Sequence, residues 1–377
     1  MNFLRHEREA LAALLPSLDD QLSGMPLMTM EQRGNPAIAL FREVGGSTLL
    51  IPAEYGGKGA TPLQAVRIQC AIGNRAPSLA IATTMHHFSV ATLVEMVEQK
   101  AGSGFEWMLL EGIAKQKLYL ASGFAEGRSG LGILTSFLKV ERTADGLVLN
   151  GSKKPCSLSA SMDLLTASMV VTGKDGEPEL AVATIPADTP GLERRRFWES
   201  PVLAGAESDE IVLTNVTVPE TLVSYFGNPA QLNAVQAKGF LWFELLVTAS
   251  YLGMATALVE RCLVAARGNA AERVRLMIDL EGSMAALEAV AHEMSNGSEG
   301  TDRLLARALF ARYSVQHAIE RMSATAVELL GGIAFINSPE VAYLYAAARA
   351  VAFHPPSRTS ISENLDKYLS GETLVIN

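Results

Sequence analysis

The sequence predicts an α+β fold in which a small β domain lies between two helical domains. Two changes in hydrophobic period carry this prediction. Over residues 1–118, and again over 226–377, apolar side chains recur at the spacing of helices, whereas over 119–225 they alternate with polar ones as in strands. We therefore expect an N-terminal helical domain, a middle antiparallel β domain and a C-terminal helical bundle with these bounds.

The N-terminal domain is expected to contain helices over Leu63–Ile72, Leu79–Val97 and Phe105–Ala114, where apolar residues repeat every three or four positions. The segment Ile51–Pro62 interrupts this pattern. It contains three glycines and two prolines, so it is predicted to be a loop.

The middle domain is expected to contain strands within 119–125, 137–143, 147–151, 164–173, 179–185 and 210–219. Turn residues separate these runs. Ala144-Asp145-Gly146 and Lys174-Asp175-Gly176 each join two alternating runs as a hairpin turn would. The predicted β domain ends near Pro219.

The C-terminal bundle is expected to contain longer helices over Phe243–Ala266, Val274–Met294 and Leu304–Leu330, with a last helical stretch between Pro339 and Pro355. Thr301 or Asp302 is predicted to cap the third of these helices at its N-terminus. A pair of glycines, at 331 and 332, is predicted to end it.

Composition excludes several classes of function. The chain has 377 residues, of which 31 are Lys or Arg and 40 are Asp or Glu, which gives a net charge of −9. Because nucleic acids and anionic membranes require clustered positive charge, we expect neither as a partner. The three cysteines are far apart, and no spacing typical of a zinc site occurs. No secretory signal or membrane-spanning stretch is found, so we expect a cytoplasmic protein, and the 49% of hydrophobic residues favours an oligomer.

Several segments, in order along nearly the whole chain, resemble the acyl-CoA dehydrogenase family: IPAEYGGKG at 51–59, ASGFAEGRSGLG at 121–132, LNGSKKPCSLS at 149–159, IVLTNVTVP at 211–219 and ELLGGIAFINSPEV at 328–341. The resemblance implies an FAD enzyme, a homodimer or homotetramer. Its flavin would lie between the β domain and the C-terminal helices. The implied reaction oxidises an acyl thioester of coenzyme A or a carrier protein, with a flavoprotein or oxygen as electron acceptor.

The resemblance also implies which residues contact the flavin. Gly130 matches a family glycine, and the backbone donors come from the residues around it. Pro155 and Ser157 replace the tryptophan and threonine that usually cover the ring, and Ser357 replaces a threonine that follows the base. A matching glycine pair implies contact with the dinucleotide of the neighbouring subunit. The implied cofactor-binding residues are Phe124, Ala125, Gly130, Leu131, Pro155, Ser157, Gly331, Gly332 and Ser357.

The usual catalytic glutamate of the family is replaced by Pro355, which has neither a carboxylate nor a backbone N–H. His354 is a candidate base because a neutral imidazole accepts a proton near pH 7. His87, on the helix expected to line the substrate side, is a second candidate. The family's alternative base position falls on Ser250, which is not a base at neutral pH, so Glu244, the closest carboxylate on the same helix, is a third candidate.

Two alternatives to acyl-thioester oxidation remain open. A related group of flavin monooxygenases has the same fold and also lacks the glutamate. It resembles this chain in placing histidines where His87 and His354 would be. In that group a partner reductase supplies reduced flavin, whose C4a-hydroperoxide is the hydroxylating species. The second alternative is a non-catalytic subunit that binds flavin or has a structural role.

Overall fold

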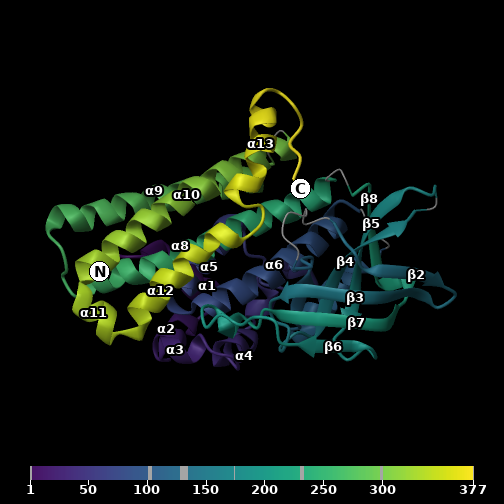
Figure 1. The fold of residues 1–377 in the computed structure, drawn as a ribbon, viewed down its shortest axis with the longest axis horizontal. Coiled ribbons are helices and arrows are strands. Elements are labelled where there is room, and N and C mark those ends of the chain that lie inside the picture. Colours follow the sequence, from purple (N-terminus) through teal and green to yellow (C-terminus); the bar gives the residue numbers. More distant parts are fainter. Residues whose placement is uncertain are drawn as a thin grey trace.

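The computed structural model describes residues 2–100, 104–127, 135–173, 175–229, 233–297 and 300–376. Helices, strands and helices follow one another in the predicted order (Figure 1). The strands lie together at one end of the molecule. The long helices extend away from them, and α11 lies at the opposite end (Figure 1).

The N-terminal helices begin and end where the sequence changes character. Thr61 caps α5 in a capping box with Gln64, and Pro62 occupies its first turn, where a missing N–H costs nothing. Pro77 then begins α6. The helices are α1 (Arg5–Leu14), α2 (Leu18–Ser23), α3 (Leu27–Met30), α4 (Pro36–Glu43), α5 (Pro62–Arg75), α6 (Pro77–Glu98) and α7 (Glu106–Gln116). The loop predicted before α5 holds only one short 3₁₀ turn, Ala53–Tyr55.

The strands form two four-stranded sheets, with the orders β1-β4-β5-β8 and β2-β3-β7-β6. The strands are β1 (Leu120–Gly123), β2 (Lys139–Thr143), β3 (Gly146–Cys156), β4 (Leu164–Thr172), β5 (Pro178–Pro186), β6 (Leu192–Arg195), β7 (Asp209–Val218) and β8 (Val223–Gly227). The β2–β3 and β4–β5 pairs are antiparallel, as the turn residues predicted. Three details differ from the prediction: β1 pairs with β4 in parallel, and neither β6 nor β8 was expected.

The C-terminal helices are α8 (Ala234–Val264), α9 (Ala270–Asn296), α10 (Thr301–Leu330), α11 (Gly332–Asn337), α12 (Pro339–Arg349) and α13 (Arg358–Leu369). Asn233 and Asn269 cap α8 and α9 in capping boxes. The predicted cap of α10 is wrong, because Gly300 is its N-cap and no side chain bonds there. The glycine pair does end α10, as predicted.

The centre of the helical part is α8, which packs against α5, α6 and α10. Two glycines bring its backbone against that of α5: a Cβ at Gly73 would lie 2.3 Å from the carbonyl oxygen of Ser250, and one at Gly253 would lie 2.2 Å from that of Cys70. Among the described helices, α8 alone is long and apolar enough to span a membrane. Its apolar window is buried throughout, as in the core helix of a globular protein.

Candidate active site

A cavity of about 1040 Å³ lies where the end of β1 meets β3, α6, α8 and the segment that follows α12. We call it the large cavity. Its lining residues are Ile81, Met85, Phe88, Ser122, Phe124, Ala125, Pro155, Ser157, Trp198, Leu203, Ser208, Phe240, Phe243, Tyr251, Ala350, Phe353, His354 and Pro355. Its walls combine aromatic rings, three serine hydroxyls and one imidazole, with no carboxylate among the lining residues that the structure describes.

Four of the residues predicted to contact a flavin line this cavity: Phe124, Ala125, Pro155 and Ser157. The hydroxyl of Ser157 lies 2.9 Å from that of Ser208, and both serines are buried. The structure therefore brings β1 and β3 together at the predicted place. Gly130 and Leu131 lie outside the described residues.

The other three predicted contact residues lie elsewhere. Gly331 and Gly332 join α10 to α11, at the end of the molecule opposite the strands, so the cavity of the same chain is out of their reach (Figure 1). A contact with flavin through these glycines would require a second subunit. Ser357 is not part of the cavity lining: it caps α13, where its Oγ accepts the N–H of Ser360.

His354 lines the large cavity, and its Nε2 lies 2.7 Å from the Tyr251 hydroxyl. Burial, and to a lesser degree the charge of Arg312, lower the pKa of His354 to about 3. Burial also raises the pKa of Tyr251 above its ordinary value. At neutral pH the pair is therefore an uncharged imidazole hydrogen-bonded to an uncharged phenol, because burial disfavours the charged form of each.

Tyr251 is a cavity residue that the sequence interpretation missed. It directly follows Ser250, the position of the family's alternative base. Ser250 itself faces away from the cavity and bonds to Thr84 and to the Leu246 carbonyl. One feature of the sequence could have indicated Tyr251. Its phenol follows directly after Ser250, the position that the resemblance aligns with a base.

The expectation that His87 faces the site is corrected by the structure. The α6 residues that line the cavity are Ile81, Met85 and Phe88, whereas the His87 ring packs against Phe41 and His86. Burial and the neighbouring His86 keep the pKa of His87 well below its usual value. His87 is thus a neutral residue of the helical core.

His86 has a structural role as well. Its Nε2 lies 2.7 Å from the Ser47 carbonyl, and its Nδ1 accepts the N–H of Leu120. Because a backbone amide can only donate, Nδ1 is unprotonated and Nε2 carries the hydrogen. His86 therefore anchors the start of β1 to α6.

The expectation that Glu244 supplies a base at the site is also corrected. Glu244 is fully buried, but it does not line the cavity. Its Oε2 accepts a hydrogen bond of 2.7 Å from Nη1 of Arg312, on α10. Burial raises the pKa of Glu244, and the arginine opposes that shift. The Glu244 carboxylate therefore forms an ion pair with Arg312 and does not face the cavity.

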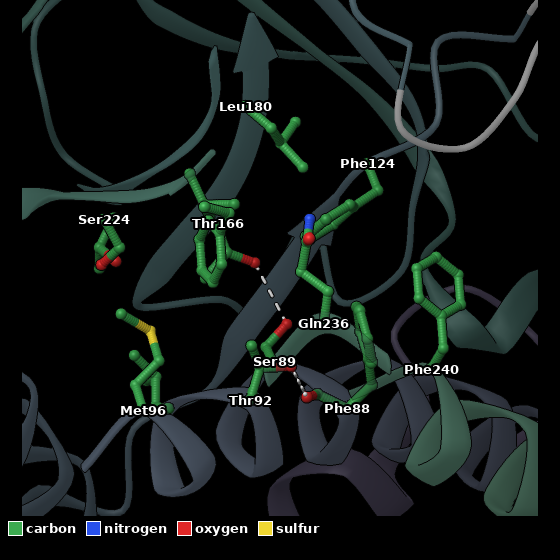
Figure 2. Close-up of a pocket in the computed structure, with 14 residues that line it drawn as sticks. Phe88, Ser89, Thr92, Met96, Phe124, Thr166, Leu180, Ser224, Gln236 and Phe240 are labelled. Carbon is green, nitrogen blue, oxygen red and sulfur yellow. Dashed lines mark hydrogen bonds between the residues drawn. The ribbon is translucent and has the colours of Figure 1, made fainter. Parts of the chain in front are cut away.

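A second hollow of about 580 Å³ adjoins the large cavity, and we call it the small pocket (Figure 2). Its lining residues are Phe88, Ser89, Thr92, Leu93, Met96, Phe124, Thr166, Leu180, Val182, Thr184, Ser224, Phe226, Gln236 and Phe240. It lies between α6, α8 and the β1-β4-β5-β8 sheet. Most of its wall is apolar. Three of its hydroxyls are already engaged: those of Ser89 and Thr166 with each other at 3.1 Å, and that of Thr92 with the Phe88 carbonyl (Figure 2).

Three phenylalanines, Phe88, Phe124 and Phe240, line both spaces and form the partition between them. The Phe88 ring centroid lies 5.4 Å from that of Phe124 and 6.3 Å from that of Phe240. The Phe88–Phe124 contact is edge-to-face and the Phe88–Phe240 pair is tilted, the arrangements that aromatic rings prefer when they pack together. The small pocket therefore offers an apolar environment directly beside the large cavity.

The large cavity fits the ring system of a flavin. That ring is flat and largely apolar, with one polar edge, so it needs aromatic or proline surfaces on its faces and hydrogen-bonding groups along one side. Trp198 and Pro155 supply such surfaces, and Ser122, Ser157 and Ser208 supply the hydroxyls. These residues, with the backbone of Phe124 and Ala125, are the ones that would hold it.

Two curated enzymes are similar to this chain. No family model matches the sequence. Isobutylamine N-hydroxylase of Streptomyces viridifaciens is 45% identical over 379 aligned residues, which cover all of both chains. Dibenzothiophene monooxygenase of Rhodococcus erythropolis is 28% identical over 57% of this chain and 52% of its own length.

Solved structures show the same fold. FMN-bound TdsC from Paenibacillus sp. A11-2 superposes with a TM-score of 0.81 over 99% of both chains, at 19% identity. KijD3 in complex with FMN and a dTDP-linked amino sugar gives a TM-score of 0.83, at 19% identity, over 98% of this chain and 95% of that one. The fold is thus that of the acyl-CoA dehydrogenases, as the sequence predicted.

This chain belongs to the family of flavin enzymes on the acyl-CoA dehydrogenase fold that includes isobutylamine N-hydroxylase. The relatives named here are hydroxylases or monooxygenases, which favours the predicted monooxygenase alternative over acyl-thioester oxidation.

Proposed function

We propose that this protein is a flavin-dependent monooxygenase that hydroxylates the nitrogen of a small aliphatic primary amine. The observation that carries the proposal is the 45% identity to isobutylamine N-hydroxylase over the full length of both chains. The apolar small pocket beside the large cavity supports the same substrate class, because it offers a short alkyl group a hydrophobic environment.

The reaction balances as follows. An amine R–NH₂, one O₂ and one reduced flavin give R–NHOH, one water and oxidised flavin. The flavin supplies the two electrons and the site at which oxygen is activated. One oxygen atom forms the new N–O bond, and the other leaves as water. A separate reductase is the expected source of reduced flavin.

The residues of this chain bind and orient the amine and handle its proton. The small pocket would bind the alkyl group, and the partition of Phe88, Phe124 and Phe240 would exclude water from the reacting nitrogen. When the N–O bond forms, the nitrogen loses one proton, and the oxygen that departs as water needs one. The hydrogen-bonded pair of Tyr251 and His354 can accept the first and donate the second, since a neutral imidazole has both a donor and an acceptor.

The large cavity is poorly suited to acyl-thioester oxidation. That reaction requires a base that removes an α proton and a donor to the thioester oxygen. Pro355, which the sequence resemblance aligns with the family glutamate, lines the cavity, and no carboxylate is among the described lining residues. An N-hydroxylase needs no such carboxylate, because the amine nitrogen is itself the nucleophile.

The proposal is tested with the purified full-length protein, a flavin reductase, NADH and a panel of amines from ethylamine to hexylamine. FAD and FMN are supplied in separate assays, because the sequence resemblance implies FAD whereas the TdsC and KijD3 structures contain FMN. We expect the alkylhydroxylamine by mass spectrometry, with ¹⁸O incorporated from ¹⁸O₂. Anaerobic bleaching of bound flavin by acyl-CoA thioesters, with no hydroxylamine from any amine, would refute the proposal.

A further inference from the structure

Arg312, on α10, and Glu244, on α8, form an ion pair behind the wall of the large cavity. The two side chains are 1% and 0% exposed, and 2.7 Å separates Nη1 of the arginine from Oε2 of the glutamate. Burying two charges is costly, and such a pair often adds little to stability. Within the described residues, Arg312 Nε and Glu244 Oε1 have no hydrogen-bond partner, so the pair is not arranged for maximum stability.

The arginine also binds the backbone of the segment that carries His354. Its Nη2 donates to the carbonyl of His354 at 2.6 Å and to that of Val351 at 3.4 Å. Its Nη1 donates to the carbonyl of Pro355 at 3.3 Å. The hydroxyl of the next residue, Tyr313, donates to the carbonyl of Pro356 at 2.9 Å. Donors from α10 thus hold four carbonyls of one short segment.

This arrangement follows from the sequence of the segment. Pro355 and Pro356 have no N–H, so this part of the chain cannot be anchored through backbone donors. Its carbonyls remain available, and a buried guanidinium, with five N–H groups in a planar fork, can satisfy several of them at once. Lysine has the same charge but cannot reproduce the fork.

We propose that Arg312, oriented by Glu244, is the positioning residue that sets His354 against Tyr251 in the large cavity. The backbone of His354 is fixed from α10 by Arg312, and its ring is fixed from α8 by the Tyr251 hydroxyl. The importance of this position for catalysis rests on the proposed function. The positioning itself is a property of the protein that can be measured without turnover.

The charge of Arg312 has a second effect on the same histidine. Together with burial, it holds the pKa of His354 low. The charged or titratable side chains that the structure places against this imidazole are Tyr251, by its hydrogen bond, and Arg312, by its charge; Glu244 is paired with the arginine. Removing the guanidinium should therefore both free the segment and make the imidazole easier to protonate.

The test compares Arg312→Lys and Arg312→Met with Arg321→Lys, a control on the same helix whose ion pair with Asp279 lies at the surface. Full-length protein labelled with ¹³C at histidine Cε1 is examined by NMR, with and without FMN. The chain has six histidines, and His354→Gln identifies the resonance of interest. In the wild type and in Arg321→Lys, this resonance should stay constant from pH 8 to pH 5.

In both Arg312 variants the His354 resonance should move or broaden at pH 8, and in Arg312→Met, which loses the charge, it should titrate at a higher pH than in the wild type. In turnover assays, hydroxylamine formed per NADH should fall at least about 10-fold, with hydrogen peroxide released instead. An unchanged resonance and an unchanged product yield in folded Arg312→Lys would overturn the proposal. So would a lowered melting temperature with both of these readouts unchanged, since that is the result of a merely structural ion pair.

Glu244→Gln covers the case in which both Arg312 variants fail to fold. The amide keeps a hydrogen bond to the arginine but removes the countercharge that orients it, so we expect the His354 resonance to be displaced at pH 8 relative to the wild type. No displacement would overturn the proposal. If the wild type hydroxylates no amine while the resonance behaves as described, the proposed function fails and the positioning role stands.

Discussion

The large cavity and the small pocket share one wall but differ in what their remaining residues can do. Beyond the three shared phenylalanines, the large cavity has serine hydroxyls and the Tyr251–His354 pair. The small pocket has five apolar side chains, the Gln236 amide and hydroxyls that are mostly bonded to other groups, with neither an imidazole nor a phenol among its described lining residues. Groups that can exchange protons with a substrate are concentrated on one side of the partition. We infer that the large cavity determines how fast the reaction proceeds and the small pocket determines which amine reacts.

This difference has a sequence counterpart. Many of the residues that line only the large cavity, such as His354 and Pro355, come from loops and strand ends, and others come from α6 and α8. Those of the small pocket come from the faces of regular elements, such as Leu180, Val182 and Thr184 on alternate positions of β5. Substitutions on a strand face change pocket shape without disturbing the residues that handle protons, so the two properties should be separable by mutation.

The largest effect is expected for His354→Ala. Loss of the imidazole should lower the rate of N-hydroxylation at least about 10²-fold for every amine, because a general acid–base group contributes about that factor. The relative preference among amines should stay the same. Initial rates of hydroxylamine formation across the amine panel measure both quantities, with His317→Ala, at an exposed position of α10, as control. A changed preference among amines would show that the large cavity also determines which amine reacts.

Tyr251→Phe should have the next largest effect. It removes one hydroxyl from a hydrogen bond to His354 and keeps the ring, so we expect the rate to fall about 10-fold, the factor that corresponds to one hydrogen bond of typical strength. The preference among amines should again be unchanged. The measurement is the ratio of hydroxylamine to hydrogen peroxide, with Tyr345→Phe, which lies outside both cavities, as control. Full activity of Tyr251→Phe would show that the Tyr251 hydroxyl takes no part in proton transfer.

Val182→Ala should act on the small pocket alone. Removing two methyl groups from its wall should raise kcat/KM for an amine one or two carbons longer than isobutylamine roughly fivefold relative to isobutylamine, since one methylene in a pocket is worth about 10-fold or more. The kcat for isobutylamine should change little. Val140→Ala, on β2, is the matched control. If Val182→Ala and Val140→Ala showed the same preference among amines, the alkyl group would not bind in the small pocket.

The smallest effect is expected from pH. Because the pKa of His354 is held near 3 and that of Tyr251 is raised, neither group changes charge between pH 6 and pH 8. The kcat should therefore vary less than about twofold over that range. The KM should fall as pH rises, because only the uncharged amine enters an apolar pocket. A kcat that follows a group titrating near 6.5 would show that His354 becomes charged in the working enzyme.

Sequence patterns located the elements that are rich in buried apolar residues better than the exposed ones. The periodic segments that predicted α5, α6 and α10 lie within the observed helices, and hairpin turns identified two strand pairs. The four-residue β6, Leu192–Arg195, was missed because its side chains are mostly exposed and show no alternation of burial. The parallel β1–β4 pair was missed because the residues that pair are far apart in the chain.

Side-chain placement was harder to predict for a physical reason. The helix α6 is buried on nearly all sides, so its hydrophobic pattern could not show which face meets the cavity, and His87 was assigned to the wrong face. Glu244 is paired with an arginine 68 positions away, and Tyr251 bonds to a histidine 103 positions away. Local spacing contains no signal for contacts of this kind. The resemblance to a family supplied His354 because it fixed the neighbourhood of Pro355.

One consequence concerns α8, an unbroken helix that reaches both spaces. It places Phe240 in the partition and Tyr251 beside His354. At 1.5 Å per residue, these two positions lie roughly 16 Å apart along the axis. The helix therefore holds the partition and the Tyr251–His354 pair at a fixed spacing. Inserting a single residue between them would turn one away from the other by about 100°, whereas a flexible loop would absorb the change.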